Sequence, residues 1–446
     1  MTTERRSTLG AFLAVTTLFF AWGFITSLID PLVAAVKGVY KLTDVQAQLS
    51  AFAFFIAYGV VSFPAARLLG KMRAVPTILL ALAMMALACL IMLGAANLAI
   101  YPLALLGLFV LASGITILQV AANPLAAALG DPKGSHFRLT LSQTFNSFGT
   151  FIGPLLGAAL FLKGVEVKTG AAITPEVRDA ALAGIDRAYF WIAGLILLLL
   201  AFFWFSRRTV AAAAPPPAPA RGIWALLVES LSSRWALFGG AAIFLYVGAE
   251  VAIGSQMALF LNSDAVWGQS DAVFGVPLLG EAIGSDGMPG VSLQEAGTAV
   301  AFYWGGAMIG RALGSALLAL VDAARLLAVF TAIACAMCLY VFAVGGVSAG
   351  FVALAIGLFN SIMFPVIFTL TLERSSASVE ATSGLLCTAI VGGAVVPLLV
   401  GALADQAGYV AALIIPAACY ALLCLFALSA ARAAPHPNAE EAPAIH

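Results

Sequence analysis

The stretch TILQVAANPLAAALGDPKGSHFRLTLSQTFNSFG, residues 116–149, decides the fold of this chain. It contains two apolar segments with helical spacing, separated by a short charged loop around Asp131, Lys133 and Arg138. The surroundings are so apolar that both helices are expected to lie in a bilayer. The stretch therefore predicts two consecutive membrane-spanning helices.

Each of these two helices carries uncharged polar side chains on one face. The spacing i, i+3, i+7 aligns Thr116, Gln119 and Asn123 on the first helix and Gln143, Asn146 and Thr150 on the second. An amide that faces lipid would leave its hydrogen bonds unmade, at a cost of several kcal/mol. We therefore expect both faces to point at protein or at a wet cavity, and we interpret the four amides as substrate-binding candidates.

The composition of the whole chain indicates a polytopic membrane protein. Of its 446 residues, 63% are hydrophobic and 9% are charged, and the mean hydropathy is +1.06; a soluble domain carries roughly 25% charge. The formal net charge is zero, so nothing favours a nucleic-acid partner. The six cysteines lie inside apolar runs, where they are expected to be small buried hydrophobic residues, not metal ligands.

About 20 apolar residues suffice for a helix to cross the bilayer, and the sequence predicts twelve such spans. They lie at 11–36, 48–70, 75–96, 101–129, 137–162, 187–206, 235–261, 293–319, 325–345, 349–372, 378–403 and 410–431. A proline-rich spacer at 211–220 separates the sixth from the seventh. The predicted parts are an N-terminal six-helix bundle (1–206), a cytoplasmic linker (207–233), a C-terminal six-helix bundle (234–431) and a disordered cytoplasmic tail (432–446).

The predicted fold class is thus an all-α integral membrane protein with two pseudo-symmetric six-helix bundles. With the N-terminus inside, most of the 21 basic residues fall in inner segments. This asymmetry predicts a multi-pass protein of the cell (inner) membrane with both termini cytoplasmic. A weak match between the sequences around Gln46 and Gln294 suggests that the halves are parallel repeats.

Two acids stand inside apolar spans, and such residues mark functional sites by default because each costs about 2.5–3.5 kcal/mol to insert. Asp30 shares a helix face with Trp22 and Thr26, at i, i+4 and i+8, so the face offers a ring, a hydroxyl and a carboxylate. A carboxylate that is buried takes up a proton more readily, which suits a proton carrier. The alternative is that Asp30 only ties the end of its helix to a neighbour, for example through Lys37.

Glu250, the second acid, stands one turn after Tyr246 and is also predicted to face a cavity. The alternative is a structural ion pair with a base such as Arg311. For Arg311 itself, the sequence favours a place near the cytoplasmic end of its helix, in a structural charge cluster with Asp322 and Arg325.

A third polar position, Asn360, lies in GLFNSIMFPVIF, one turn before Phe364. Pro365 in the same stretch is expected to free backbone carbonyls. Tyr303 and Trp304, in the eighth span, can present rings to a cavity. Amides pair with hydroxyl groups and rings stack on the C–H faces of sugars, so this set favours a sugar as substrate; the alternative for each ring is packing between helices. The glycines of GRALGS are interpreted as close helix contacts.

The motifs FFAWGFITSLIDPL (19–32), AANPLAAALG (121–130), FRLTLSQTFNSFGTFIGPLLG (137–157), YVGAE (246–250) and FNSIMFP (359–365) resemble the sugar–proton symporters of the fucose permease and glucose/galactose transporter group, within the major facilitator superfamily. The resemblance implies two six-helix bundles, alternating access, and a monosaccharide carried with a proton. Asp30 matches the acid that fucose permease uses in proton coupling. Gln143 and Asn146 match polar positions of its sugar cavity.

The sequence also departs from fucose permease. That protein has a glutamate at the position of Gln119, asparagines at Thr26 and Ser27, and a glutamine at Glu250. Because Gln119 cannot titrate, the resemblance implies a proton route through Asp30 and Glu250. Glucose, galactose or an amino sugar is favoured over fucose as substrate.

The predicted function is therefore import of a monosaccharide with a proton, by a monomer whose partners are the sugar and the lipid bilayer. No cofactor or metal is expected beyond the co-transported H⁺, with Na⁺ or no coupling as alternatives. A sugar sensor without transport is a further alternative. A membrane enzyme is disfavoured because the three histidines lie in a loop and in the tail, and because no HExxH or GxSxG motif occurs.

Overall fold

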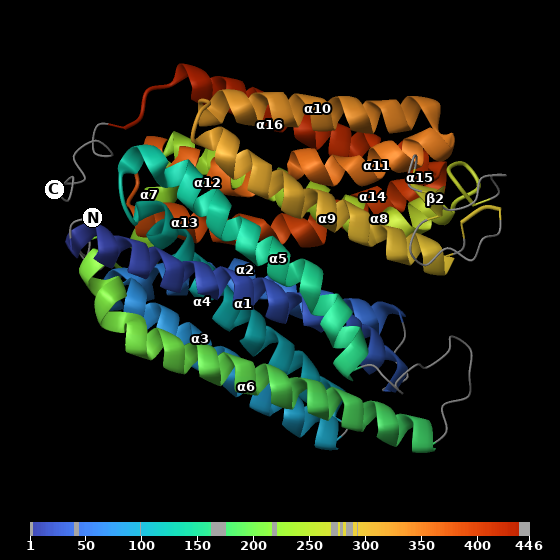
Figure 1. Cartoon of the computed structure of the whole chain (residues 1–446), viewed down its shortest axis with the longest axis horizontal. Coiled ribbons are helices and arrows are strands. Elements are labelled where there is room, and N and C mark those ends of the chain that lie inside the picture. Colours follow the sequence, from blue (N-terminus) through green and yellow to red (C-terminus); the bar gives the residue numbers. More distant parts are fainter. Residues whose placement is uncertain are drawn as a thin grey trace. The chain divides into compact units, whose positions relative to one another are not determined.

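The computed structural model describes residues 3–39, 44–98, 100–161, 175–215, 221–268, 275–276, 280–281, 289–291 and 293–436. These ranges are almost entirely helical (Figure 1). Within them, ten segments are long and apolar enough to cross a membrane. Two more helices, of 27 and 26 residues, have sufficient length but carry more polar residues. The predicted all-α membrane fold is confirmed.

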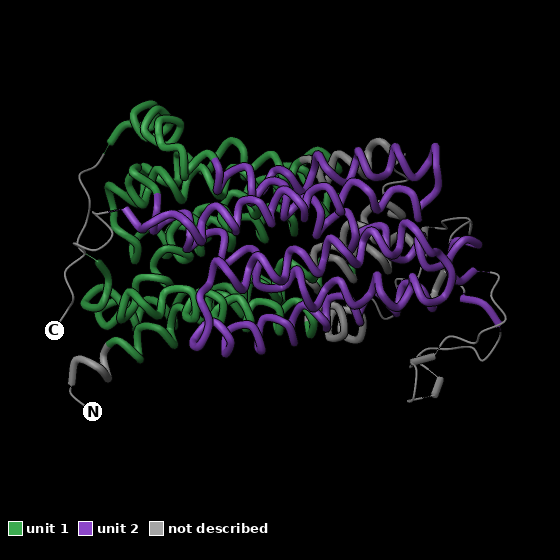
Figure 2. The backbone as a smooth tube through the Cα atoms, turned by 90° about the horizontal axis from the view of Figure 1, so that it is seen from above, with its two compact units in different colours: residues 1–237, 375–389, 437–446 green, residues 238–374, 390–436 purple. Residues whose placement is uncertain are grey.

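The chain divides into two compact units, coloured separately in Figure 2. Unit 1 comprises residues 1–237, 375–389 and 437–446, and unit 2 comprises residues 238–374 and 390–436. The helices of unit 1 along the first 237 residues are α1 (Thr3–Val39), α2 (Asp44–Met72), α3 (Ala74–Leu98), α4 (Tyr101–Ala128), the 3-10 turn η1 (Pro132–Gly134), α5 (Ser135–Phe161), α6 (Pro175–Ala213) and α7 (Ile223–Ser232). Within this unit α3 packs against α4 and α6, and α1 packs against α5.

The stretch 116–149 forms the helix, charged loop and helix that its sequence predicts. After α4 ends, Gly130 takes a φ of +120°, which favours glycine, and the carboxylate of Asp131 accepts from the backbone N–H of Lys133 at 2.9 Å. Arg138 folds back over the loop and donates to the carbonyls of Asp131, at 2.7 Å, and Ala127. Its cation therefore lies where the dipole of α4 favours positive charge.

Helices α1 and α5 pack with their backbones in close contact. A Cβ added at Gly23 would lie 2.1 Å from the carbonyl oxygen of Asn146, and one added at Gly149 would lie 2.3 Å from that of Phe20. Only glycine fits at such distances, which is the device that membrane helices use to approach one another. This crossing holds the polar face of α5 beside α1.

Unit 2 contains a second set of helices and a short hairpin of two strands. Its elements are α8 (Arg234–Asn262), β1 (Gly275–Val276), β2 (Gly280–Glu281), α9 (Leu293–Leu318), α10 (Ala323–Val344), α11 (Gly346–Asn360), α12 (Met363–Arg374), the 3-10 turn η2 (Ala389–Val391), α14 (Gly392–Ala407), α15 (Tyr409–Ala412) and α16 (Ile414–Arg432). α10 packs against α16 and α11, and α11 packs against α9. The hairpin is antiparallel, with Gly275 opposite Glu281.

Three predicted spans are interrupted in the structure. The tenth breaks between α11 and α12, the eleventh passes through η2, and the twelfth breaks between α15 and α16. Pro365 and Pro416 explain two of the breaks, because neither can donate to the carbonyl four residues earlier. All three segments are nevertheless long and apolar enough to cross a membrane, as the sequence predicts.

The interrupted eleventh span is divided between the two units. Its first part, α13 (Val379–Thr388), belongs to unit 1, where Gly384 meets α2: an added Cβ would lie 3.0 Å from the Cβ of Ala66. Helix α7, inside the predicted linker, contacts the start of α13 through Glu229, whose carboxylate accepts from the backbone N–H of Ser378 at 2.8 Å.

The predicted bundle boundaries remain a prediction. The predicted tail begins where α16 ends, and residues 437–446 lie outside the described residues.

Candidate functional site

The amides of α4 and α5 form a buried cluster in unit 1. Gln119, Asn123 and Gln143 are at most 5% exposed. The side-chain N–H of Gln119 donates to the hydroxyl of Tyr58, on α2, at 2.7 Å. The side-chain N–H of Gln143 donates to the side-chain oxygen of Asn123 at 3.4 Å. The structure thus brings together the two polar faces that the sequence predicts to point inward.

One amide of this cluster has hydrogen-bonding capacity left over. The Nδ2 group of Asn123 is buried and has no hydrogen-bond partner. An unmade hydrogen bond at a buried polar group costs about 1–3 kcal/mol. This donor is therefore available to a water molecule or to a hydroxyl group of a ligand.

The remaining predicted residues of this unit lie along α1 and α5. Asn146 donates through Nδ2 to the carbonyl of Phe19, on α1, at 3.1 Å. Trp22 is buried beside Phe19, with ring centroids 5.5 Å apart. Thr26 donates to the carbonyl of Trp22 in its own helix at 2.9 Å. The Asp30 side chain lies outside the described residues, so its predicted role stays a prediction.

A buried ion pair forms the centre of the second cluster, in unit 2. The Nη2 group of Arg311, on α9, lies 3.2 Å from the Oε1 atom of Glu250, on α8, and the two side chains are 11% and 12% exposed. The same nitrogen donates to the hydroxyl of Tyr246 at 3.4 Å. Asp322, which the sequence grouped with Arg311, instead caps α10 by accepting from the backbone N–H of Arg325 at 2.9 Å. The structure thus contains the Glu250–Arg311 pair that the sequence left as an alternative; a role for Glu250 toward a cavity stays a prediction.

Asn360 lies between the hydroxyl groups of two tyrosines close to this ion pair. Its Nδ2 group donates to the hydroxyl of Tyr303 at 2.7 Å and lies 3.5 Å from that of Tyr420, on α16. The Tyr303 hydroxyl in turn donates to the backbone carbonyl of Glu250 at 3.2 Å. Asn360, Tyr303 and Tyr420 are fully buried, yet the Oδ1 atom of Asn360 has no hydrogen-bond partner. The second cluster thus offers a free acceptor, as the first offers a free donor.

Aromatic rings adjoin the polar groups of the second cluster. Trp304 is half-buried and meets Tyr303 edge-on, with centroids 5.0 Å apart. Gly254, on α8, makes room for it, because an added Cβ would lie 2.7 Å from the Trp304 ring. Phe364 lies 6.4 Å from Tyr246, centroid to centroid. The predicted polar and aromatic residues of this unit therefore lie together.

Three members of these clusters were missed by the sequence analysis as site residues: Tyr58, Arg311 and Tyr420. Tyr58 and Tyr420 each carry a hydroxyl in an apolar span, and a buried hydroxyl requires a partner. Arg311 was assigned to a helix end, and its pairing with Glu250 was given only as an alternative. The available signal was the presence of one isolated acid and one isolated base within neighbouring spans.

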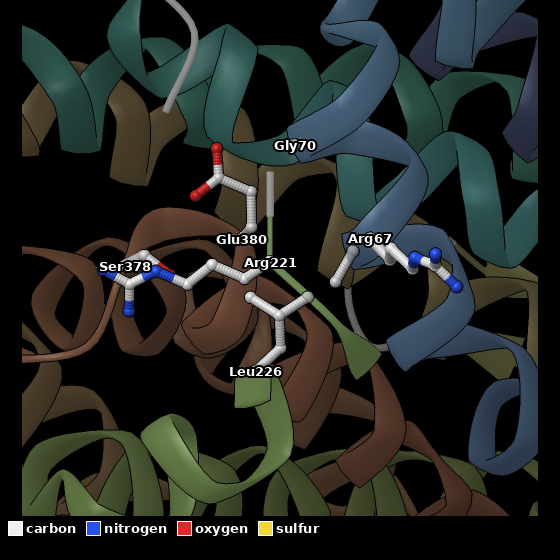
Figure 3. A pocket seen from close by; sticks show the side chains of 7 residues that line it. Arg67, Gly70, Arg221, Leu226, Ser378 and Glu380 are labelled. Carbon is white, nitrogen blue, oxygen red and sulfur yellow. The ribbon is translucent and has the colours of Figure 1, made fainter. Parts of the chain in front are cut away.

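Figure 3 shows a small pocket within unit 1. It is lined by Ala66, Arg67, Gly70, Arg221, Leu226, Ser378 and Glu380. Its volume of about 30 Å³ suffices for a water molecule or two. Arg221 is already paired with Glu229 at 2.8 Å. None of the predicted site residues lines this pocket.

Each of the two clusters, taken by itself, suits a neutral, hydroxyl-rich ligand. They offer amide donors and acceptors, tyrosine hydroxyls and the half-buried ring of Trp304, and the buried Glu250–Arg311 pair is neutral as a whole. Among the described residues, no group of three or more histidine, cysteine or acidic side chains is placed to hold a metal ion.

The chain is similar to known proteins along almost its whole length. The family model of the Major Facilitator Superfamily matches residues 11–385. A glucose/galactose transporter of Brucella abortus is 38% identical over 422 residues, which are 94% of this chain and 93% of that protein. An L-fucose–proton symporter of Escherichia coli is 29% identical over 437 residues, 95% of this chain and 94% of that protein.

The fold is similar to that of a solved transporter as well. A crystal structure of the Escherichia coli fucose:proton symporter FucP superposes with a TM-score of 0.82 at 26% sequence identity, covering 96% of this chain and 100% of that chain. A structure of FucP in the outward conformation gives a TM-score of 0.81 at 28% identity, with the same coverage.

Proposed function

The chain belongs to the major facilitator superfamily, and from this premise we propose that it is a secondary transporter that imports a monosaccharide with a proton by alternating access. The sugar is of the glucose or galactose type, or an amino sugar. The observation that carries this proposal is the 38% identity, across 94% of the chain, to a protein named as a glucose/galactose transporter. The chain is not an enzyme.

The chemistry of the two clusters supports a sugar as substrate. A hydroxyl group both donates and accepts a hydrogen bond. A sugar hydroxyl can therefore accept from Nδ2 of Asn123 in the cluster of unit 1, or donate to Oδ1 of Asn360 in the cluster of unit 2. The binding residues proposed in unit 1 are Trp22, Thr26, Gln119, Asn123, Gln143 and Asn146. Those proposed in unit 2 are Tyr246, Tyr303, Trp304, Asn360 and Phe364.

Proton coupling is proposed to use Asp30 and Glu250. Protonation of Asp30 removes a charge whose desolvation opposes reorientation of the carrier. Gln119 cannot take this part: its amide donates to Tyr58 and has no titratable proton. Sodium coupling and uncoupled transport are the alternatives, because a carboxylate with nearby hydroxyls binds either cation. No cofactor takes part in the proposed cycle.

We further propose that the protein acts as a monomer in the inner membrane, with both termini in the cytoplasm. A single chain supplies both clusters, and the excess of lysine and arginine lies in segments on the side of the N-terminus. Labelling of single cysteines at the termini in intact and opened cells tests this orientation.

Uptake into proteoliposomes tests the transport proposal. We expect counterflow of labelled glucose or galactose by the purified protein. A membrane enzyme would release a chemically changed product, and a sensor would move no label. In Asp30→Asn, uphill uptake driven by a pH gradient should disappear while exchange persists; uphill uptake at the wild-type level would reject Asp30 as the coupling residue. In Asn146→Ala, sugar affinity should fall up to about tenfold, since a hydrogen bond to the sugar is lost.

A further inference from the structure

The break in the tenth span leaves one backbone carbonyl without a helical donor. In an unbroken helix, the carbonyl of Ser361 would accept from the N–H of residue 365, but that residue is Pro365 and has none. The helix resumes immediately afterwards, since the N–H of Val366 donates to the carbonyl of Ile362 at 3.1 Å. The carbonyl that lacks a helical donor is thus that of Ser361, next to Asn360 of the second cluster.

Arg311 supplies the missing donor. Its Nε group donates to the carbonyl of Ser361 at 2.8 Å, a good distance for a charge-assisted hydrogen bond. The approach is possible because α9 lies very close to the break: a Cβ added at Gly310 would lie 2.2 Å from the carbonyl oxygen of Leu358, and one at Gly314 would lie 2.2 Å from Ile362. The glycines interpreted as close helix contacts thus bring the guanidinium to the break.

The other edge of the same guanidinium holds Glu250. Nη2 lies 3.2 Å from Oε1 of Glu250 while Nε is bonded to Ser361, so one planar group joins the acid of α8 to the break between α11 and α12. The fork geometry of arginine allows two such bonds in fixed directions, whereas the single ammonium of a lysine is a point charge on a flexible stem.

We propose that Arg311 is a positioning residue that links the charge of Glu250 to the break in the tenth span, and thereby to Asn360. With Glu250 ionised, the guanidinium is held between the carboxylate and Ser361. With Glu250 neutral, the guanidinium loses its counter-charge and the break loses its clamp. The proposal rests on the proposed function, because it gives the proton a way to act on a sugar-binding residue.

The groups that surround Glu250 do not replace Arg311 in this role. Tyr246 on α8 and Tyr303 on α9 contact the pair through their hydroxyls. Tyr420 on α16 and Cys338 on α10 lie beyond, near Tyr303. Among these neighbours Arg311 is the only permanent charge, so it responds most strongly to the protonation of Glu250.

Hydrogen–deuterium exchange of the purified protein, without sugar, tests the link. The observable is exchange in peptides covering 357–371, corrected for the intrinsic pH dependence of exchange. Peptides from α10, in the same unit, serve as the internal reference. Glu250→Gln, which mimics the protonated acid, should raise exchange at the break about tenfold, the factor equivalent to about 1.4 kcal/mol. In the wild type, acidification should do the same, and in Glu250→Gln it should do nothing further.

Two further variants test the proposed link in case Glu250→Gln fails to fold. Arg311→Lys keeps the charge opposite Glu250 but cannot hold both partners, so exchange at the break should rise and lose its pH response. Pro365→Ala supplies the missing N–H to Ser361, so exchange should fall and become insensitive to Glu250→Gln.

Some outcomes would overturn the proposal. Unchanged exchange at the break in Glu250→Gln would do so. An equal rise in the α10 peptides would do so as well, because it would indicate general loosening of unit 2. Because no sugar is present, the exchange result is independent of transport. If exchange at the break depends on pH in a protein that moves no sugar, only the proposed function is rejected. If the protein transports sugar but exchange at the break is the same in the wild type and in Glu250→Gln, only the proposed link is rejected.

Discussion

Removing one partner of the Glu250–Arg311 pair should destabilise unit 2 strongly. Both side chains are close to 90% buried, so the remaining charge would have little water to solvate it. Breaking a buried pair in this way costs about 3–5 kcal/mol. We therefore expect Glu250→Gln and Arg311→Met each to lower the free energy of unfolding by about that amount.

The double variant distinguishes this explanation from simple loss of packing. Glu250→Gln with Arg311→Met leaves no buried charge, so it should recover at least about 2 kcal/mol relative to the sum of the single effects. Unfolding by a denaturing detergent, followed by tryptophan fluorescence, measures all three. Arg221→Met is the matched control: Arg221 pairs with Glu229 at 2.8 Å but is 49% exposed, so its loss should cost under about 1 kcal/mol. Strictly additive costs for Glu250 and Arg311 would refute the reasoning.

Further substitutions test the contacts around the two clusters, each by the same unfolding measurement. Gly357→Val should lower the free energy of unfolding by more than about 3 kcal/mol, because the added Cβ would lie 2.0 Å from the carbonyl oxygen of Tyr303. Gly297→Ala is the control. The added methyl group meets open space, so this change should be neutral or stabilising by up to about 1 kcal/mol. Tyr58→Phe should cost about 1–3 kcal/mol, since the amide of Gln119 would lose its partner, and a Tyr58→Phe protein as stable as the wild type would mean that another group accepts from Gln119. Ser378→Ala removes the hydroxyl that caps α13, accepting from the backbone N–H of Ala381, and should cost about 1 kcal/mol; no change would show that the Glu229 contact to the backbone suffices.

The all-α membrane fold could be predicted because it depends on local properties of the sequence. Apolar spans, a proline-rich spacer and the polar faces of 116–149 are all visible within short windows. The breaks were harder to place, because a proline inside an apolar span leaves open whether the helix kinks or stops. Pro124 and Pro64 lie inside continuous helices, whereas Pro365 accompanies a break. At Pro365 the carbonyl that lacks a helical donor, that of Ser361, accepts from Arg311 instead.

The sequence predicted which residues belong to the candidate site better than it predicted their hydrogen-bond partners. The amides at 119, 123, 143 and 360 are buried, as their cost in lipid requires. Their partners come from other spans: Tyr58 for Gln119, and Tyr303 for Asn360. Such pairings depend on how helices distant in sequence pack, which one sequence does not specify. The close approach of α9 to the tenth span, through Gly310 and Gly314, is the packing detail that moved Arg311 from a helix end to the centre of a cluster.

The central claim is that this transporter moves a sugar with a proton, and pH-driven sugar uptake tests it most directly. Purified protein in proteoliposomes, acidic outside and without sodium, should accumulate labelled glucose or galactose above the external concentration, and an ionophore that collapses the pH gradient should abolish the accumulation. Uptake that never exceeds equilibrium, or that persists after the gradient is collapsed, would contradict the claim.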